Sequence, residues 1–121
     1  MPYRILIADD HHGIRQRVRS DLEAAGFEIC GEAVNGLEAV TKAKALLPDL
    51  IILNLSMPVM NGFDAIPLIV RSAPGAKIII FSVEEDEELR QEAFRRGAHG
   101  YVRKSSPANL ISEVTRLLGI H

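Results

Sequence analysis

The sequence predicts an α/β protein, built as a doubly wound five-stranded parallel sheet with helices on both faces. Short apolar runs alternate five times with stretches of helical period, which is typical of β-α units. Three of the runs, Ile5–Ala8, Leu50–Leu53 and Ile78–Phe81, are almost continuously aliphatic, as expected of strands buried on both faces. The length of 121 residues, 47% of them hydrophobic, fits one domain spanning 1–121.

The two remaining strands are expected at the edges of the sheet. Between Phe27 and Val34, acidic side chains and Cys30 alternate with apolar ones, a period of two that suits a strand with one exposed face. The run Gly100–Val102 is short, and we expect it at the opposite edge.

Two helices are predicted before the central strand. The first has an apolar face that recurs every fourth residue and stops at Gly26. That face consists of Ile14, Val18 and Leu22. The second covers 36–47, with Asn35 as its N-cap and Pro48 ending it.

Three helices follow the central strand. The first of them contains Phe63, Ile66, Leu68 and Ile69, and Pro67 must lie in or near its first turn to avoid a kink. The next begins after the acidic run 84–88 and ends at Arg95, Arg96 and Gly97, as the helix dipole favours. The last starts near Pro107, and its apolar residues are Leu110, Ile111, Val114, Leu117 and Leu118.

Composition excludes several classes of function. The net charge of −2 gives no basic surplus, so we expect no direct nucleic-acid binding by this domain. Cys30 is the only cysteine, which excludes an intrachain disulfide. Neither a signal peptide nor an apolar stretch of roughly 20 residues is evident, so we expect a cytoplasmic domain without membrane association.

Polar side chains stand where the predicted strands end. Asp9 and Asp10 follow the first strand, Asn54 the third and Ser82 the fourth, and the fifth leads to Lys104. In a doubly wound sheet, ligands bind beyond the carboxyl ends of the strands. Carboxylates hold magnesium, while a hydroxyl and an ammonium bind phosphoryl oxygens. Each residue alone suits a turn, a cap or the surface, but the set predicts a site for a cation and a phosphoryl group.

Over nearly its whole length the chain resembles the receiver domain of bacterial two-component response regulators. The segments that carry the resemblance are 7–11 (IADDH), 57–62 (MPVMNG), 97–101 (GAHGY) and 104–105 (KS). Residues 9–11, 31–33 and 101–105 most resemble the NarL/FixJ subfamily, whose members usually carry a C-terminal LuxR-type helix-turn-helix. The resemblance implies the flavodoxin-like strand order 2-1-3-4-5, a histidine kinase as partner and a non-enzymatic role in phosphorelay signalling.

The resemblance also implies roles for the residues at the strand ends. Asp9, Asp10 and the backbone carbonyl of Ser56 would hold Mg²⁺. Ser82 and Lys104 would bind the phosphoryl oxygens. Tyr101 would be the switch residue, turning inward when Ser82 moves toward the phosphoryl group.

Position 54 departs from the family, because an aspartate should accept the phosphoryl group there and this chain has asparagine. An amide nitrogen is not nucleophilic, so this chain cannot form an aspartyl phosphate at position 54. Magnesium loses a carboxylate, so weak binding is expected. The sequence leaves two origins open: a change engineered to block phosphorylation, or a natural atypical receiver that acts as a protein-interaction module. A smaller departure is Ser105, where many receivers have proline, and we expect a trans bond there.

Other functions fit the residues less well. A haloacid-dehalogenase-type phosphatase needs two aspartates two residues apart, whereas Asp9 and Asp10 are adjacent. A flavin binder needs a phosphate-cradling loop after the first strand, and this acidic turn would repel phosphate. His11 and His12 are adjacent, so they do not form a shared metal face on a helix. Because phosphorylation is blocked, we expect at most a weak homodimer.

Overall fold

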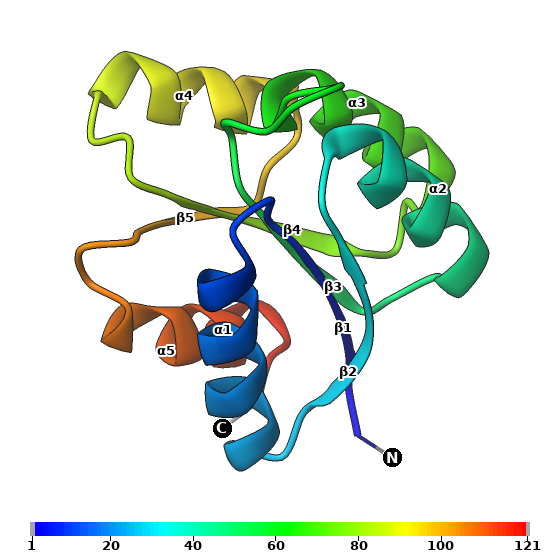
Figure 1. Ribbon diagram of the computed structural model, residues 1–121, viewed down its shortest axis with the longest axis vertical. Coiled ribbons are helices and arrows are strands. Elements are labelled where there is room, and N and C mark those ends of the chain that lie inside the picture. Colours follow the sequence, from blue (N-terminus) through cyan, green and yellow to red (C-terminus); the bar gives the residue numbers. More distant parts are fainter. Residues whose placement is uncertain (1, 121) are drawn as a thin grey trace.

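The computed structural model describes residues 2–120, so positions 1 and 121, the ends of the predicted domain, lie outside the described residues. Five strands form one parallel sheet in the order β2-β1-β3-β4-β5, which confirms the predicted order (Figure 1). The elements are β1 (Arg4–Ala8), α1 (His12–Ala24), β2 (Glu28–Ala33), α2 (Gly36–Leu46), β3 (Leu50–Leu53), α3 (Gly62–Ser72), β4 (Lys77–Ser82), α4 (Glu87–Arg96), β5 (Gly100–Arg103) and α5 (Ala108–Leu117).

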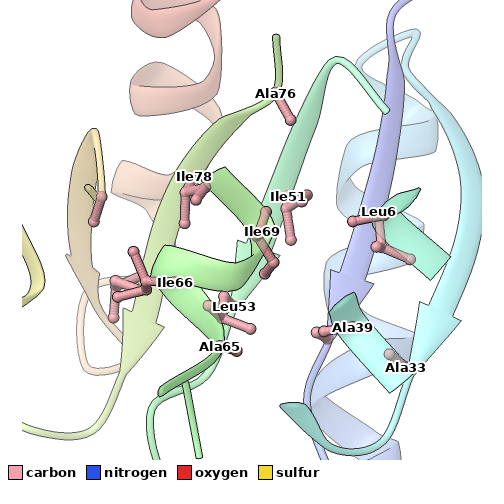
Figure 2. Close-up of a cluster of buried hydrophobic side chains, with 14 of the residues drawn as sticks. Leu6, Ala33, Ala39, Ile51, Leu53, Ala65, Ile66, Ile69, Ala76 and Ile78 are labelled. Atoms are coloured by element: carbon pink, nitrogen blue, oxygen red, sulfur yellow. The ribbon is translucent and has the colours of Figure 1, made fainter. Parts of the chain in front are cut away.

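Helices cover both faces of the sheet, so the core has two halves. Helices α1 and α5 lie on one face, and α2, α3 and α4 lie on the other (Figure 1). On the second face, Ile51 and Ile78 of the strands lie beside Ile69 of α3, and Leu6 lies on the side of Ala39 of α2 (Figure 2). Alternate residues of the same strands point to the opposite half, which explains why the predicted runs are apolar throughout.

The predicted central and edge strands are confirmed. Strands β1, β3 and β4 are almost completely buried, whereas β2 pairs only with β1 and β5 only with β4. The alternation expected in β2 is weak, because most of its residues are half-buried. The pairing of β1 with β2 shifts register between Ile5 and Leu6, and such an irregularity interrupts a strict period of two.

Helix caps follow the sequence signals. The Asn35 side chain accepts a hydrogen bond from the Glu38 backbone N–H, at 2.8 Å, and so caps α2 as predicted. Helix α4 has glutamates in its first turn and Arg95 and Arg96 in its last, and it ends at Gly97 with a φ of 122°. All peptide bonds among residues 2–120 are trans, including the bond before Ser105.

The expected place of Pro67 is wrong. Helix α3 starts at Gly62 because Asn61 caps it, accepting a hydrogen bond from the Asp64 N–H at 2.9 Å. Pro67 is therefore well inside the helix, beyond the first turn, where it cannot donate to the carbonyl of Phe63. The cap residue, rather than the proline, sets the start of this helix.

The apolar face of α5 is turned inward. Leu110 and Val114 are buried, and Ile111, Leu117 and Leu118 are half-buried against the core half under α1. None of these five side chains is among the exposed large apolar residues.

A membrane-spanning helix is not found within residues 2–120, where each helix is too short or too polar for that purpose.

A pH dependence of stability is expected from His99, at the sheet end opposite the polar residues. The backbone N–H of Ile78 donates to Nδ1 of the His99 ring at 3.0 Å. The backbone N–H of His99 donates in turn to the Ile78 carbonyl at 2.8 Å. Partial desolvation of the ring, aided by the charge of Lys77, lowers the pKa of His99. Because the folded pKa lies below the unfolded value of about 6.5, this stability is complete above that pH and is lost as the pH falls below it.

The measurement is urea unfolding of the native chain and of His99→Asn at pH 7.5 and 5.5, since asparagine accepts a hydrogen bond without titrating there. The native chain should lose more stability than the variant on acidification, by no more than about 1 kcal/mol, the net value of one hydrogen bond. Equal losses in both proteins would show that His99 does not contribute.

Candidate functional site

The five side chains singled out at the strand ends lie at the same end of the sheet, where the parallel strands finish. This carboxyl end of the sheet is called the acidic edge below. Asp9 and Asp10 follow β1, Asn54 follows β3, Ser82 ends β4 and Lys104 follows β5. Backbone pairing continues into this region, since the Asn54 N–H donates to the Ala8 carbonyl at 2.9 Å and the Lys104 N–H to the Ser82 carbonyl at 2.8 Å. The carboxyl ends of four parallel strands therefore bring acid, amide, hydroxyl and ammonium groups together.

A buried ion pair joins the first and fifth strands. Lys104 Nζ lies 2.6 Å from Asp9 Oδ2, and the two side chains are only 11% and 4% exposed. The other carboxylate oxygen of Asp9 accepts a hydrogen bond from the His11 N–H at 2.9 Å. Both oxygens of this buried acid are therefore partnered, as a charge in a low-dielectric setting requires.

Asn54 is buried beside the more exposed Asp10. Its amide nitrogen lies 3.3 Å from Asp10 Oδ1 and 2.8 Å from the backbone carbonyl oxygen of Ser56. Asn54, Asp10 and Ser56 therefore form one connected group.

Ser82 and Tyr101 meet the same segment after β4. The Ser82 Oγ accepts a hydrogen bond from the Glu84 N–H at 3.1 Å, and the Tyr101 hydroxyl donates to the Glu84 carbonyl at 2.8 Å. Burial raises the pKa of Tyr101, so this phenol stays protonated and remains a donor. A movement of Ser82 would act on Glu84, but the expected inward turn of Tyr101 stays a prediction.

The loop between β3 and α3 is held close to the site by two glycines. The Gly36 N–H donates to the Met60 carbonyl, and the Gly62 N–H donates to the Leu55 carbonyl, both at 2.8 Å. A Cβ on Gly62 would lie 2.3 Å from the Asn54 carbonyl oxygen. Val59 at the loop tip is exposed and has a φ of 68°, a conformation that β-branched residues rarely adopt.

Arg15 supports the acidic turn and was not among the predicted site residues. Its guanidinium donates to the Asp9 backbone carbonyl at 2.8 Å and to Glu32 at 3.0 Å. Burial opposes ionisation of Glu32, but hydrogen bonds from Arg19 and Arg15 outweigh it and lower the pKa of this acid. No local pattern relates an arginine in α1 to a glutamate in β2, so sequence reasoning could not find this pair.

Comparisons with known proteins relate this chain to one family. The model of the response regulator receiver domain family matches residues 5–115. The chain is 37% identical over 118 residues to the chemotaxis protein CheY of Thermotoga maritima, covering 97% of this chain and 98% of that protein. It is 38% identical over 112 residues to the nitrate/nitrite response regulator NarL of Escherichia coli K12, covering 91% of this chain and 52% of NarL.

A solved structure extends the likeness to the fold. The crystal structure of a LuxR-family two-component response regulator from Aurantimonas sp. SI85-9A1 superposes with a TM-score of 0.93 at 30% identity, covering 98% of this chain and 86% of that one. The chain thus has relatives among both CheY and NarL/LuxR proteins, and it spans about half the length of NarL. The chain belongs to the response regulator receiver domain family.

Proposed function

We propose that residues 1–121 form a receiver domain of the NarL/FixJ kind, acting in phosphorelay signalling rather than as an enzyme. One observation supports the proposal: Asp9, Asp10, Asn54, Ser82 and Lys104 all lie at the carboxyl end of the sheet. The family resemblance implies that Asn54 occupies the position of the acceptor aspartate. With asparagine at position 54 no aspartyl phosphate forms there, because that amide is not a nucleophile.

The partners follow from the family. Receiver domains interact with histidine kinases and with output domains, and generally bind Mg²⁺. NarL and LuxR-family relatives favour a transcriptional output domain of the LuxR-type helix-turn-helix class for the full protein. In this proposal Asp9, Asp10 and the Ser56 carbonyl are the groups that would hold Mg²⁺, weakly while asparagine stands at position 54. Ser82 and Lys104 would bind the phosphoryl group, and Tyr101 is the switch residue. The domain acts in the cytoplasm.

The Asn54→Asp variant is expected to become phosphorylated by acetyl phosphate in the presence of Mg²⁺. The carboxylate oxygen at position 54 would attack phosphorus, and the bond from phosphorus to the acetate oxygen would break, releasing acetate. Lys104 would balance charge on the phosphoryl oxygens, and the Ser82 hydroxyl would donate to one of them. Intact-mass spectrometry should show the mass of one phosphoryl group on nearly all of this variant and on none of the native chain.

The control is Asn54→Ala, which also lacks an acceptor and should stay unmodified. An equal mass gain on the native chain would show that the acceptor is elsewhere and that position 54 is wrongly assigned. If Asn54→Asp also stayed unmodified, the prediction that an aspartate at position 54 restores phosphorylation would be wrong.

The second candidate is a phosphorylation-independent receiver that acts by binding partners. The observation that favours it is the hydrogen-bonded state of the site, in which Asn54, Asp10 and Ser56 already satisfy one another. A folded Asn54→Asp that takes up no phosphoryl group would favour this candidate over the first.

A further inference from the structure

The amide of Asn54 has only one workable orientation. Its nitrogen faces Asp10 Oδ1 at 3.3 Å and the Ser56 carbonyl oxygen at 2.8 Å. An ionised carboxylate and a backbone carbonyl are acceptors only, so the NH₂ end must point at them and the oxygen end cannot. Both N–H donors of this amide are therefore used, one on each acceptor.

These two acceptors belong to the oxygen set that the family resemblance assigns to magnesium. The third member, Asp9, accepts hydrogen bonds from Lys104 and from the His11 N–H. Each of the three groups thus already accepts a hydrogen from the protein. Magnesium needs near-octahedral oxygens at about 2.0–2.1 Å, so the ion would have to displace the Asn54 hydrogens from two of these oxygens.

Charge leads to the same conclusion. Asp9 and Asp10 carry two negative charges, which Lys104 and the polarised N–H groups of Asn54 offset. A carboxylate at position 54 would add a third negative charge and place lone pairs against those of Asp10, an arrangement that a bound cation would have to relieve. Asparagine supplies donors at the same position and removes that need.

We propose that the Asn54 amide takes the structural place of the divalent cation, holding Asp10 and the Ser56 carbonyl in one arrangement with or without metal. Asn54 is then a positioning residue, and the acidic edge presents the same surface to a partner whatever the Mg²⁺ concentration. The inference rests on the proposed function, because it takes this edge as the metal and phosphoryl site of a receiver.

The test compares Mg²⁺-dependent stability in the native chain, Asn54→Ala and Asn54→Asp. Each is unfolded in urea with EDTA or with 10 mM MgCl₂ at matched ionic strength, followed by circular dichroism because the chain has no tryptophan. Magnesium should change the folding equilibrium constant of the native chain less than about twofold. It should raise that of Asn54→Asp by about tenfold or more, as expected when the ion concentration is about ten times Kd.

Asn54→Ala distinguishes the inference from simple loss of charge. If asparagine only lacks a charge, alanine and asparagine should respond equally to magnesium. If the amide occupies the place of the ion, alanine leaves Asp10 and the Ser56 carbonyl free to bind Mg²⁺. The change that Mg²⁺ makes in the folding equilibrium constant of Asn54→Ala should then exceed that of the native chain by about threefold or more. Should Asn54→Ala not fold, Asn54→Ser serves, since one hydroxyl hydrogen cannot replace both amide donors.

Equal responses of the native and alanine chains, or a native response as large as that of Asn54→Asp, would overturn the inference. An Asn54→Asp that gains stability with Mg²⁺ but takes up no phosphoryl group would count against phosphoryl acceptance, while the inference about the amide would stand.

Discussion

Replacing Lys104 with methionine is expected to lower the free energy of unfolding by about 3 kcal/mol or more, because it leaves the Asp9 carboxylate buried without its cation. Asp9 is 3% exposed, and after the change only the His11 N–H of its two partners would remain. Methionine keeps most of the apolar stem, which limits the loss to the charge and to the contact of the ammonium over the Phe81 ring. Urea unfolding at pH 7 measures the effect.

Two further variants separate this cause from others. Arg116→Met removes an exposed ion pair with Glu113, so it should cost less than about 1 kcal/mol. Combining Lys104→Met with Asp9→Asn should restore much of the lost stability, because no uncompensated charge then remains buried. Additive losses in the double variant would show that the pair is not coupled.

Replacing Gly62 with alanine is expected to destabilise the domain by about 3 kcal/mol, the upper part of the range for overpacking. The new Cβ would lie 2.3 Å from the Asn54 carbonyl oxygen and 2.9 Å from the Leu55 Cα. Both are backbone atoms between β3 and the loop, so relief requires the chain after β3 to move. Thermal and urea unfolding measure the loss of stability.

Gly13→Ala is the matched control, since it also changes a glycine in the first turn of a helix beside the site. Its Cβ would meet only the His11 ring, at 3.5 Å, which is an ordinary contact. Alanine is favoured over glycine in a helix by about 1 kcal/mol, so this variant should be equally or more stable. Similar losses in both variants would mean that the approach of Gly62 to Asn54 is not the cause.

The alternation of apolar runs and helical stretches determined the fold class, the five strands and which of them lie at the edges. Parallel strands buried on both faces require continuous apolar runs, and that requirement is local enough to be read from the chain. The same reasoning indicated which polar residues meet, since each stands directly after a strand. The prediction that Pro67 lies in or near the first turn was wrong, because the cap at Asn61 outweighs the preference of proline for the first turn.

Only the tertiary structure decided how the polar residues pair. Sequence placed Asp9, Asp10, Asn54, Ser82 and Lys104 at one edge, but it did not show that Lys104 binds Asp9 or that the Asn54 amide faces Asp10 and Ser56. The hydrogen bond from Arg15 to the Asp9 carbonyl, and the pairing of Arg15 with Glu32 of β2, were equally hidden. A hydrogen bond forms only where donor and acceptor are placed to within a few tenths of an ångström. For segments far apart in the chain, that placement is set by packing rather than by residue type.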